Sequence, residues 1–384
     1  MKRIYFDHSA TTPVDEEVLQ EMLPYFTEKF GNASSIHSYG RAAKVVLEES
    51  REVVADLCRA HANEIYFTGS GTEADNLAIL GVIRHPGNQG KHIITSKIEH
   101  HAVLHPCEQL EKEGYEVTYL PPDEYGMIDP DSVAQAIRKE TVLISVMHAN
   151  NEVGTINPVQ EISRIARERE VLFHTDAVQT FGKLSIDLRQ LPVDLMTMSG
   201  HKIYGPKGVG VLYIRRGVKL KPIMFGGAHE KNRRPGTENI PAIVGLAKAA
   251  AICKKNMNAD EKKIKSLRDK FFEKIKDNIP RVRLNGHLEQ RLPGLLNLSF
   301  EGIEGEALLL SLDLKGVAAS SGSACTSGSV DPSHVLRAMG VPPNIAQSSI
   351  RFSLGRSNTM EDIDYTVEVL KEIVERLRKL SPFE

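Results

Sequence analysis

The chain has 384 residues, which is enough for one large domain and a smaller second one. Its formal net charge is only −2, and this balance gives no support to a nucleic-acid partner or an anionic membrane surface. No apolar run is long enough to cross a membrane, and the first residues turn polar before a signal peptide forms, so we expect a cytoplasmic protein without a membrane partner.

Short apolar runs alternate with helical patterns from about residue 64 to residue 215, which is typical of a mainly parallel sheet with crossover helices. The expected strands are 65–68, 92–95, 115–120, 142–147, 171–174, 194–197 and 210–214. The expected helices among them are 73–80, 102–112 and 159–170.

A long helical stretch follows Pro241 and leads into short strands, such as residues 296–300, and a charged terminal helix. The sequence therefore predicts an α/β fold, with a large, mainly parallel sheet between helices and a smaller α+β domain. We place the large domain at residues 17–255 and build the small domain from residues 1–16 and 256–384.

A glycine-rich turn joins the first strand of the sheet to its helix in the segment Ile65–Ala74. Such a turn directs backbone N–H groups and a helix N-terminus at one point, which suits a phosphate. Gly69, Gly71 and Ala74 also fit the dinucleotide pattern, with Glu99 as the acid that binds a ribose. A third interpretation is a turn that only connects the two elements.

Asp176 and Lys202 follow neighbouring strands of the expected sheet, at the edge where open α/β folds bind ligands. Pyridoxal phosphate needs a lysine for its Schiff base and an acid beside its pyridine nitrogen, so the pair suits this cofactor. Alternatively, Asp176 caps a helix and Lys202 is a surface charge. Lys207 is a rival for the Schiff base. Ser199 and Lys202 also fit the S-x-x-K of serine hydrolases, whose other motifs are absent.

Three histidines and a cysteine lie close together at the next strand-to-helix turn: His100, His101, His105 and Cys107. The spacing of His101 and His105 allows a shared helix face and raises the possibility of zinc. No further ligand pattern completes such a site. A histidine at this position also suits stacking on a flat ring or moving a proton.

Cys325 lies in a segment, residues 316–329, that is dominated by alanine, serine and glycine. Such a segment buries little apolar surface, so we expect a mobile surface loop with a reachable thiol. Cys58, Cys107 and Cys253 have helical contexts and are interpreted as packing residues. An incidental exposed cysteine remains the alternative for Cys325.

Arg351 alternates with Ile350 and Phe352 in a short expected strand, so its side chain should point away from the surface on which those two pack. A guanidinium binds the α-carboxylate of an amino acid through two hydrogen bonds. A structural salt bridge is the alternative.

These motifs, in this order, resemble the NifS/IscS-type cysteine desulfurases of the class-V aminotransferase family, which are fold-type-I pyridoxal-phosphate enzymes. The resemblance covers nearly the whole chain, through residues 5–12, 32–37, 68–76, 99–100, 150–154, 174–179, 199–202, 234–239 and 320–337. Two departures are Ala33 in place of a usual proline and the absence, after Glu384, of a tail that some members use to bind a scaffold protein.

The resemblance implies a catalytic role for three residues. Lys202 would form the Schiff base with pyridoxal phosphate, and His100 would stack on its ring and assist proton transfer. Cys325 would take the sulfur of L-cysteine as a persulfide while alanine leaves. The persulfide could then pass to an acceptor or iron–sulfur scaffold protein, with Cys325 as a transient cluster ligand.

The resemblance also implies how the cofactor and the substrate are held. Asp176 would pair with the pyridine nitrogen and Gln179 with the ring hydroxyl, while Asn151 and Arg351 would bind cofactor and substrate. The phosphate would be held by Gly71, Thr72, Ser199 and His201, with Thr237 reaching in from the second subunit of a homodimer.

Other functions remain open at this point. An aminotransferase or a selenocysteine lyase of the same fold would keep Lys202 and Asp176 without needing Cys325 as a sulfur carrier. A nicotinamide dehydrogenase would use the turn at Gly69 and leave Asp176, Lys202 and Cys325 without roles. A non-catalytic sulfur relay would need Cys325 alone.

Overall fold

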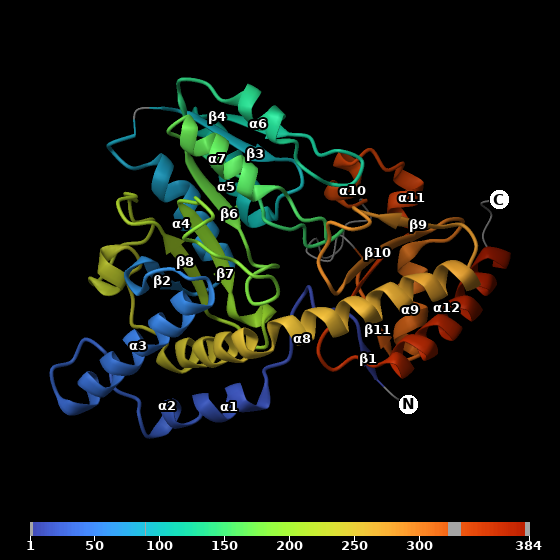
Figure 1. Ribbon diagram of the computed structural model, residues 1–384, viewed down its shortest axis with the longest axis horizontal. Coiled ribbons are helices and arrows are strands. Elements are labelled where there is room, and N and C mark those ends of the chain that lie inside the picture. The colour runs from blue at the N-terminus through green and yellow to red at the C-terminus, as the bar shows by residue number, and fades with distance from the viewer. Residues whose placement is uncertain (1–2, 89, 322–331, 381–384) are drawn as a thin grey trace.

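The computed structural model describes residues 3–88, 90–321 and 332–380. Its largest sheet has seven strands in the order β2-β8-β7-β6-β5-β3-β4 (Figure 1). They are β2 (Ile65–Thr68), β3 (His92–Ser96), β4 (Glu116–Leu120), β5 (Thr141–Ser145), β6 (Leu172–Asp176), β7 (Leu195–Ser199) and β8 (Gly210–Ile214). Within this sheet only β8 runs against its neighbours, so the prediction of a mainly parallel sheet is confirmed.

Helices cover both faces of this sheet, because successive side chains of a strand point to opposite sides. Ile93 packs into one apolar cluster, and the next residue, Ile94, packs into another. The cluster that holds Ile93 is built with α4 (Gly71–Ile83) and α5 (His101–Lys112). The cluster that holds Ile94 is built with α3 (Ser38–Leu57), α7 (Val159–Glu168) and the first half of α8 (Ile240–Asn278).

A smaller α+β part surrounds an antiparallel sheet in the order β12-β10-β9. Its elements are β9 (Val282–Asn285), β10 (Leu295–Phe300), α9 (Gly305–Leu314), β12 (Ser349–Ser353) and α12 (Met360–Leu380). The rings of Phe6, Phe271 and Phe352 meet in its core, with centroids 5.2 to 6.3 Å apart. Helix α8 runs from the large sheet into this part (Figure 1).

The N-terminal segment belongs to the smaller part, because β1 (Ile4–Tyr5) pairs in parallel with β11 (Val317–Ala318). The assignment of residues 1–16 and 256–384 to a small domain and of residues 17–255 to a large one remains a prediction. The remaining elements are α1 (Glu16–Met22), α2 (Pro24–Thr27), η1 (Ala62–Glu64), α6 (Pro130–Ala136), η2 (Gly200–Lys202), η3 (His229–Asn232), α10 (His334–Ala338) and α11 (Pro343–Gln347).

The carboxyl ends of β6 and β7 bring the expected chemistry together. β6 ends at Asp176, and β7 ends at Ser199 and continues directly into η2, which contains Lys202. The two strands are neighbours in the parallel sheet, so their carboxyl ends lie at the same edge. In the described parts of the chain, no helix has the length and apolar character needed to cross a membrane.

Candidate active site

The N-terminus of α4 lies against the end of β7. Ser70 caps the helix by accepting a 3.1 Å hydrogen bond from the Glu73 N–H. Gly71 approaches its surroundings so closely that an added Cβ would lie 3.0 Å from Val178 Cγ2 and 3.5 Å from Ser199 Cβ. A side chain added at Gly71 would thus crowd Val178. This close contact places the first turn of the helix, on which Thr72 is exposed, next to Val178 and Ser199.

The amine of Lys202 contacts the N-terminal segment. Lys202 Nζ donates hydrogen bonds of 2.5 Å to the Ser9 carbonyl and 2.7 Å to the Ala10 carbonyl. Lys207, the rival for the Schiff base, is exposed. The geometry therefore favours Lys202, since its amine is positioned beside the other candidate residues.

Asp176 is buried, and one of its carboxylate oxygens accepts a 2.8 Å hydrogen bond from the Val178 N–H. Burial raises the pKa of Asp176 to about 6, although the Val178 N–H and the charge of Lys202 act in the opposite direction. Behind it, the fully buried Asp75 also has a raised pKa, mainly through burial and then through the charge of Asp176. A cation beside Asp176 would thus relieve a costly buried charge.

His100 is the N-cap of α5, and its Nδ1 accepts a 3.1 Å hydrogen bond from the Ala102 N–H. Burial, followed by the charge of Lys202, lowers the pKa of His100 to about 4. The imidazole is therefore neutral near pH 7 and carries its proton on Nε2.

Gln179 and His201 complete the surroundings of Lys202. Gln179 Nε2 donates a 3.0 Å hydrogen bond to the same Ser9 carbonyl that Lys202 contacts. His201 Nδ1 lies 3.1 Å from Thr11 Oγ1, and burial lowers the pKa of His201 to about 4.

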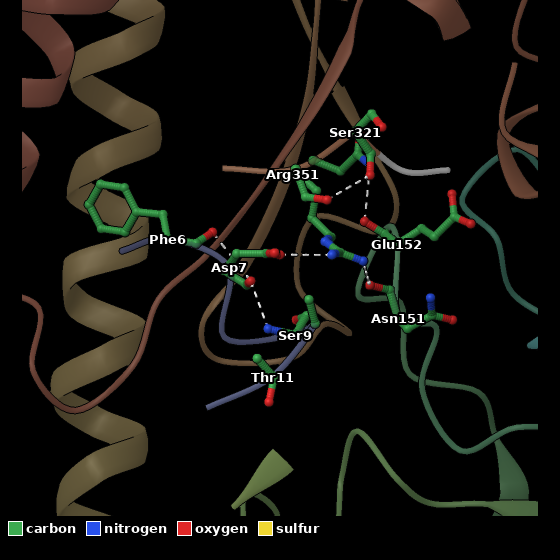
Figure 2. Close-up of polar contacts among 12 residues, drawn as sticks. Phe6, Asp7, Ser9, Thr11, Asn151, Glu152, Ser321 and Arg351 are labelled. Atoms are coloured by element: carbon green, nitrogen blue, oxygen red, sulfur yellow. Dashed lines mark hydrogen bonds and ion pairs between the residues drawn. The ribbon is translucent and has the colours of Figure 1, made fainter. Parts of the chain in front are cut away.

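Arg351 lies at the side of the site, where its guanidinium is held between two segments (Figure 2). One terminal nitrogen donates a 2.9 Å hydrogen bond to Asp7 Oδ1 and the other a 3.0 Å hydrogen bond to the Asn151 carbonyl. Its Nε is buried without a hydrogen-bond partner among the described residues. Ile350 and Phe352 pack in the small core, so the predicted alternation of this strand is confirmed. Arg351 thus combines a structural ion pair with an unused donor.

The histidine cluster forms a stack of rings. The centroids of His101 and His105 are 4.7 Å apart, and those of His101 and His334 are 4.9 Å apart. Among the described residues, no group of three or more His, Cys, Asp or Glu side chains is arranged to hold a metal ion. The zinc interpretation therefore gains no support from this part of the chain.

Cys58, Cys107 and Cys253 are buried free thiols, as the sequence predicts. Burial raises the pKa of both Cys58 and Cys107 to about 12, which makes them poor nucleophiles. Cys325 and the greater part of its predicted loop lie outside the described residues.

Two further residues bear on the alternatives. Glu99 is fully buried, and its carboxylate accepts hydrogen bonds from Ser96 Oγ at 2.5 Å and the Met147 N–H at 3.0 Å. Glu99 therefore cannot bind a ribose, and the dinucleotide interpretation no longer has an acid for that role. Thr237 is exposed on the loop that follows η3.

Sequence reasoning assigned no site role to Asp7, Ser9, Ala10 or Lys183. Asp7 pairs with Arg351, and the Ser9 and Ala10 carbonyls bind Lys202. The polar run that follows Phe6 was a usable signal for a functional segment. Contacts made by backbone carbonyls, however, cannot be predicted from the identity of the side chain, because every residue has a carbonyl.

The chemistry of these residues fits pyridoxal phosphate. The cradle at Gly71, which a Cβ would crowd, and the N-terminus of α4 suit a phosphate. The buried Asp176 suits a protonated ring nitrogen, and the nearby amine of Lys202 suits a Schiff base.

Known proteins resemble this chain over nearly its whole length. The class-V aminotransferase family matches residues 4–366. A protein of Methanosarcina thermophila named cysteine desulfurase IscS is 54% identical over 381 residues, which are 99% of this chain and 94% of that protein. A protein of Dictyoglomus turgidum with the same name is 52% identical, over 100% of this chain and 98% of its own length.

Solved structures agree as well. A NifS-like protein superimposes with a TM-score of 0.92 at 39% identity, covering 98% of this chain and all of that one. A structure titled SspA in complex with cysteine gives a TM-score of 0.82 at 36% identity, covering 93% of this chain and all of that one. The chain therefore belongs to the class-V aminotransferase family and, within it, to the cysteine desulfurases of the NifS/IscS type, with their fold-type-I architecture.

Proposed function

We propose that this chain is a pyridoxal-phosphate enzyme that transfers the sulfur of L-cysteine to Cys325 and releases L-alanine. The observation that carries the proposal is the placement of Lys202 and Asp176 at neighbouring strand ends, beside the glycine cradle of α4. The relatives named cysteine desulfurase support the choice of reaction.

In this reaction the bound cofactor supplies an electron sink for the carbon atoms of the substrate. Asp176 keeps the ring nitrogen protonated, and Gly71, Thr72, Ser199 and His201 hold the phosphate. Gln179 donates a hydrogen bond to the ring oxygen. The neutral His100 and the amine of Lys202 hold and move protons at the substrate.

Arg351 binds the α-carboxylate of the substrate, with Asn151 beside it. The unpartnered Nε of Arg351 supplies one donor, and the carboxylate displaces Asp7 from the guanidinium to gain a second. The segment that bears Asp7 also holds Lys202 through the Ser9 carbonyl, so substrate binding and the position of the amine are coupled.

The sulfur transfer is balanced without an external oxidant. The carbon–sulfur bond of cysteine breaks, a sulfur–sulfur bond forms on Cys325, and the carbon receives a proton to give the methyl group of alanine. The cysteine carbon is reduced by two electrons while the two sulfur atoms are oxidised. A thiol reductant then releases the outer sulfur as sulfide while the thiol is oxidised to a disulfide, or the thiolate of an acceptor protein takes that sulfur as a new persulfide.

The proposed setting is a cytoplasmic homodimer in which Thr237 of each subunit reaches the phosphate of the other. Its partner is a sulfur-acceptor or iron–sulfur scaffold protein, with Cys325 as a transient cluster ligand. The exposed position of Thr237 agrees with a role outside its own subunit.

The test compares L-cysteine, L-selenocysteine, and L-alanine with an α-keto acid as substrates for the purified protein with cofactor and thiol reductant. We expect equal amounts of alanine and sulfide from L-cysteine. Turnover of selenocysteine alone would indicate a lyase, and amino-group exchange with the keto acid would indicate an aminotransferase. Either result would overturn the proposal.

A further inference from the structure

The geometry points to Lys183 as a positioning residue, which fixes the amide of Gln179 and through it the donor that Gln179 presents beside Lys202. The effect of Lys183 on turnover rests on the proposed function. The contacts from which it is inferred are a series of hydrogen bonds. The series runs from Lys183 through Gln179 and the Ser9 carbonyl to Lys202.

The contacts define the orientation of the Gln179 amide. In its charged form Lys183 Nζ can only donate, and it lies 3.2 Å from Gln179 Oε1. The Ser9 carbonyl, which can only accept, receives Gln179 Nε2 at 3.0 Å. Reversing the amide would place two donors together at one end and two acceptors together at the other. Lys183 and Ser9 therefore hold the amide in one of its two orientations.

This orientation decides which group Gln179 offers to the cofactor. An amide nitrogen has two N–H donors, and the Ser9 carbonyl uses one of them. The other N–H remains for an anionic oxygen such as the ring oxygen of pyridoxal phosphate. Without Lys183, only the Ser9 carbonyl opposes reversal of the amide, and the reversed amide would turn its carbonyl oxygen toward that anion, which is repulsive.

Lys183 also lines a cavity of about 60 Å³ that extends behind Lys202, with Tyr204 and Cys253 in its wall. This volume is enough for several water molecules beside Lys183. The ring nitrogens of His8, another lining residue, are buried without hydrogen-bond partners among the described residues.

The surroundings of Lys183 do not favour its charge. Burial, followed by the charge of Lys202, lowers the pKa of Lys183 to about 7. The charges that act on this pKa come from Lys202, Arg351 and Cys253, and His8 and His201 are themselves influenced by Lys183. The wall of the same cavity also contains Asp260, Glu261, Tyr204 and Arg356. Neither of these two carboxylates is among the causes that shift the pKa of Lys183, so keeping the amine charged at this position costs stability.

The experiment compares Lys183→Met, which removes the donor, with Lys183→Arg, which keeps it. Met257→Leu, a volume-conserving change elsewhere in the cavity wall, serves as the matched control. Titration of each apoprotein with pyridoxal phosphate measures affinity, and the visible absorption of the bound cofactor is followed against pH. Thermal unfolding of the apoproteins measures stability separately.

We expect Lys183→Met to weaken cofactor binding and to lower kcat by about 100-fold, as a misplaced active-site group does. The arginine variant should recover most of the loss, and Met257→Leu should match the wild type. The folded pKa of Lys183 lies below its ordinary value of 10.5, so wild-type apoprotein should gain stability as pH rises from about 7 to 10.5. The methionine variant should lack this gain and melt no lower than the wild type at pH 7.

A double variant tests whether Lys183 acts through Gln179. Lys183→Met should add no further loss of affinity to Gln179→Leu, because the two residues form one unit. Additive losses, or wild-type affinity and absorption in Lys183→Met, would overturn the inference. If the wild type binds the cofactor but forms no alanine, the proposed function fails, while the affinity comparison still tests Lys183.

Discussion

Lys202 differs from its neighbour Lys207 in where its amine is held. Two backbone carbonyls bind the Lys202 amine beside the buried Asp176, whereas Lys207 is exposed. We predict that Lys202→Ala abolishes covalent attachment of pyridoxal phosphate and that Lys207→Ala does not. Borohydride reduction followed by peptide mass spectrometry locates the attachment. A modified Lys207 in the Lys202→Ala variant would show that Lys207 can form the Schiff base and would contradict the assignment to Lys202.

Asp176 holds its charge at the expense of stability. The pKa of Asp176 is raised from 3.8 to about 6, so the folded apoprotein keeps a proton that the unfolded chain has released between these values. The stability contributed by this group is therefore present at low pH and is lost as pH rises from about 4 to 6. In Asp176→Asn, we predict that this loss disappears from apoprotein melting curves.

The same substitution should lower kcat by about 100-fold or more, because the ring nitrogen loses its ionic partner. The asparagine oxygen still accepts from the Val178 N–H, so the local backbone is preserved. Unchanged kcat with unchanged melting would remove Asp176 from the proposed site.

At the residue scale, the sequence identifies groups whose identity and strand position carry the signal. Asp176 and Lys202 lie at the ends of strands whose carboxyl ends share a sheet edge. Arg351 alternates with the apolar residues Ile350 and Phe352, which pack in the small core. The sequence could not reveal the Ser9 carbonyl, because any residue supplies one. Lys183 was equally hidden, since its importance depends on its contact with Gln179.

At the scale of elements, the first turn of α4 carries a charge pair beside the proposed phosphate site. Glu73 accepts 2.9 Å and 2.8 Å hydrogen bonds from the Gly69 N–H and from Arg234 Nε. Arg234 thus neutralises an acid that would otherwise repel a phosphate at this helix terminus.

We predict that Arg234→Ala weakens binding of pyridoxal phosphate about fivefold, corresponding to about 1 kcal/mol for a partly exposed pair. Adding Glu73→Gln should restore the affinity, because the repelling charge is then gone. Titration of the apoproteins measures both. Equal affinities of the single and double variants would argue against this electrostatic account.

The elements themselves follow from period and turn chemistry, but their ends do not. The helix expected at 73–80 begins at Gly71, because Ser70 supplies the cap. The strand expected at 171–174 extends to Asp176, which continues the pairing with β7. Strand order within the sheet depends on long-range packing, and so does the pairing of β1 with β11. Local patterns contain no such information.

At the scale of the whole molecule, the loop that bears Thr237 is fixed at its base. The buried Glu230 forms two 2.8 Å hydrogen bonds with Arg51 and accepts a third from the Phe67 N–H. Residues 230–232 all adopt left-handed backbone conformations beside this anchor. The loop is thus anchored on its own subunit while Thr237 remains exposed.

We predict that hybrid dimers reveal Thr237 acting across the subunit interface. Thr237→Val homodimers should bind the cofactor more weakly, and Lys202→Ala homodimers should not attach it. Mixed dimers of the two variants should regain one site of wild-type affinity, because the Lys202→Ala subunit supplies an intact Thr237. If mixing restores nothing, Thr237 serves its own subunit or lies outside the site.

In the proposed reaction, Cys325 carries the sulfur taken from L-cysteine. The most direct test is a single turnover of the cofactor-loaded protein with L-cysteine and no reductant, followed by peptide mass spectrometry and alanine assay. We predict one added sulfur atom on Cys325 for each alanine released, neither product from Cys325→Ser, and unchanged products from the buried-thiol control Cys58→Ala. Alanine release by Cys325→Ser at the wild-type rate, or a persulfide on another cysteine, would contradict it.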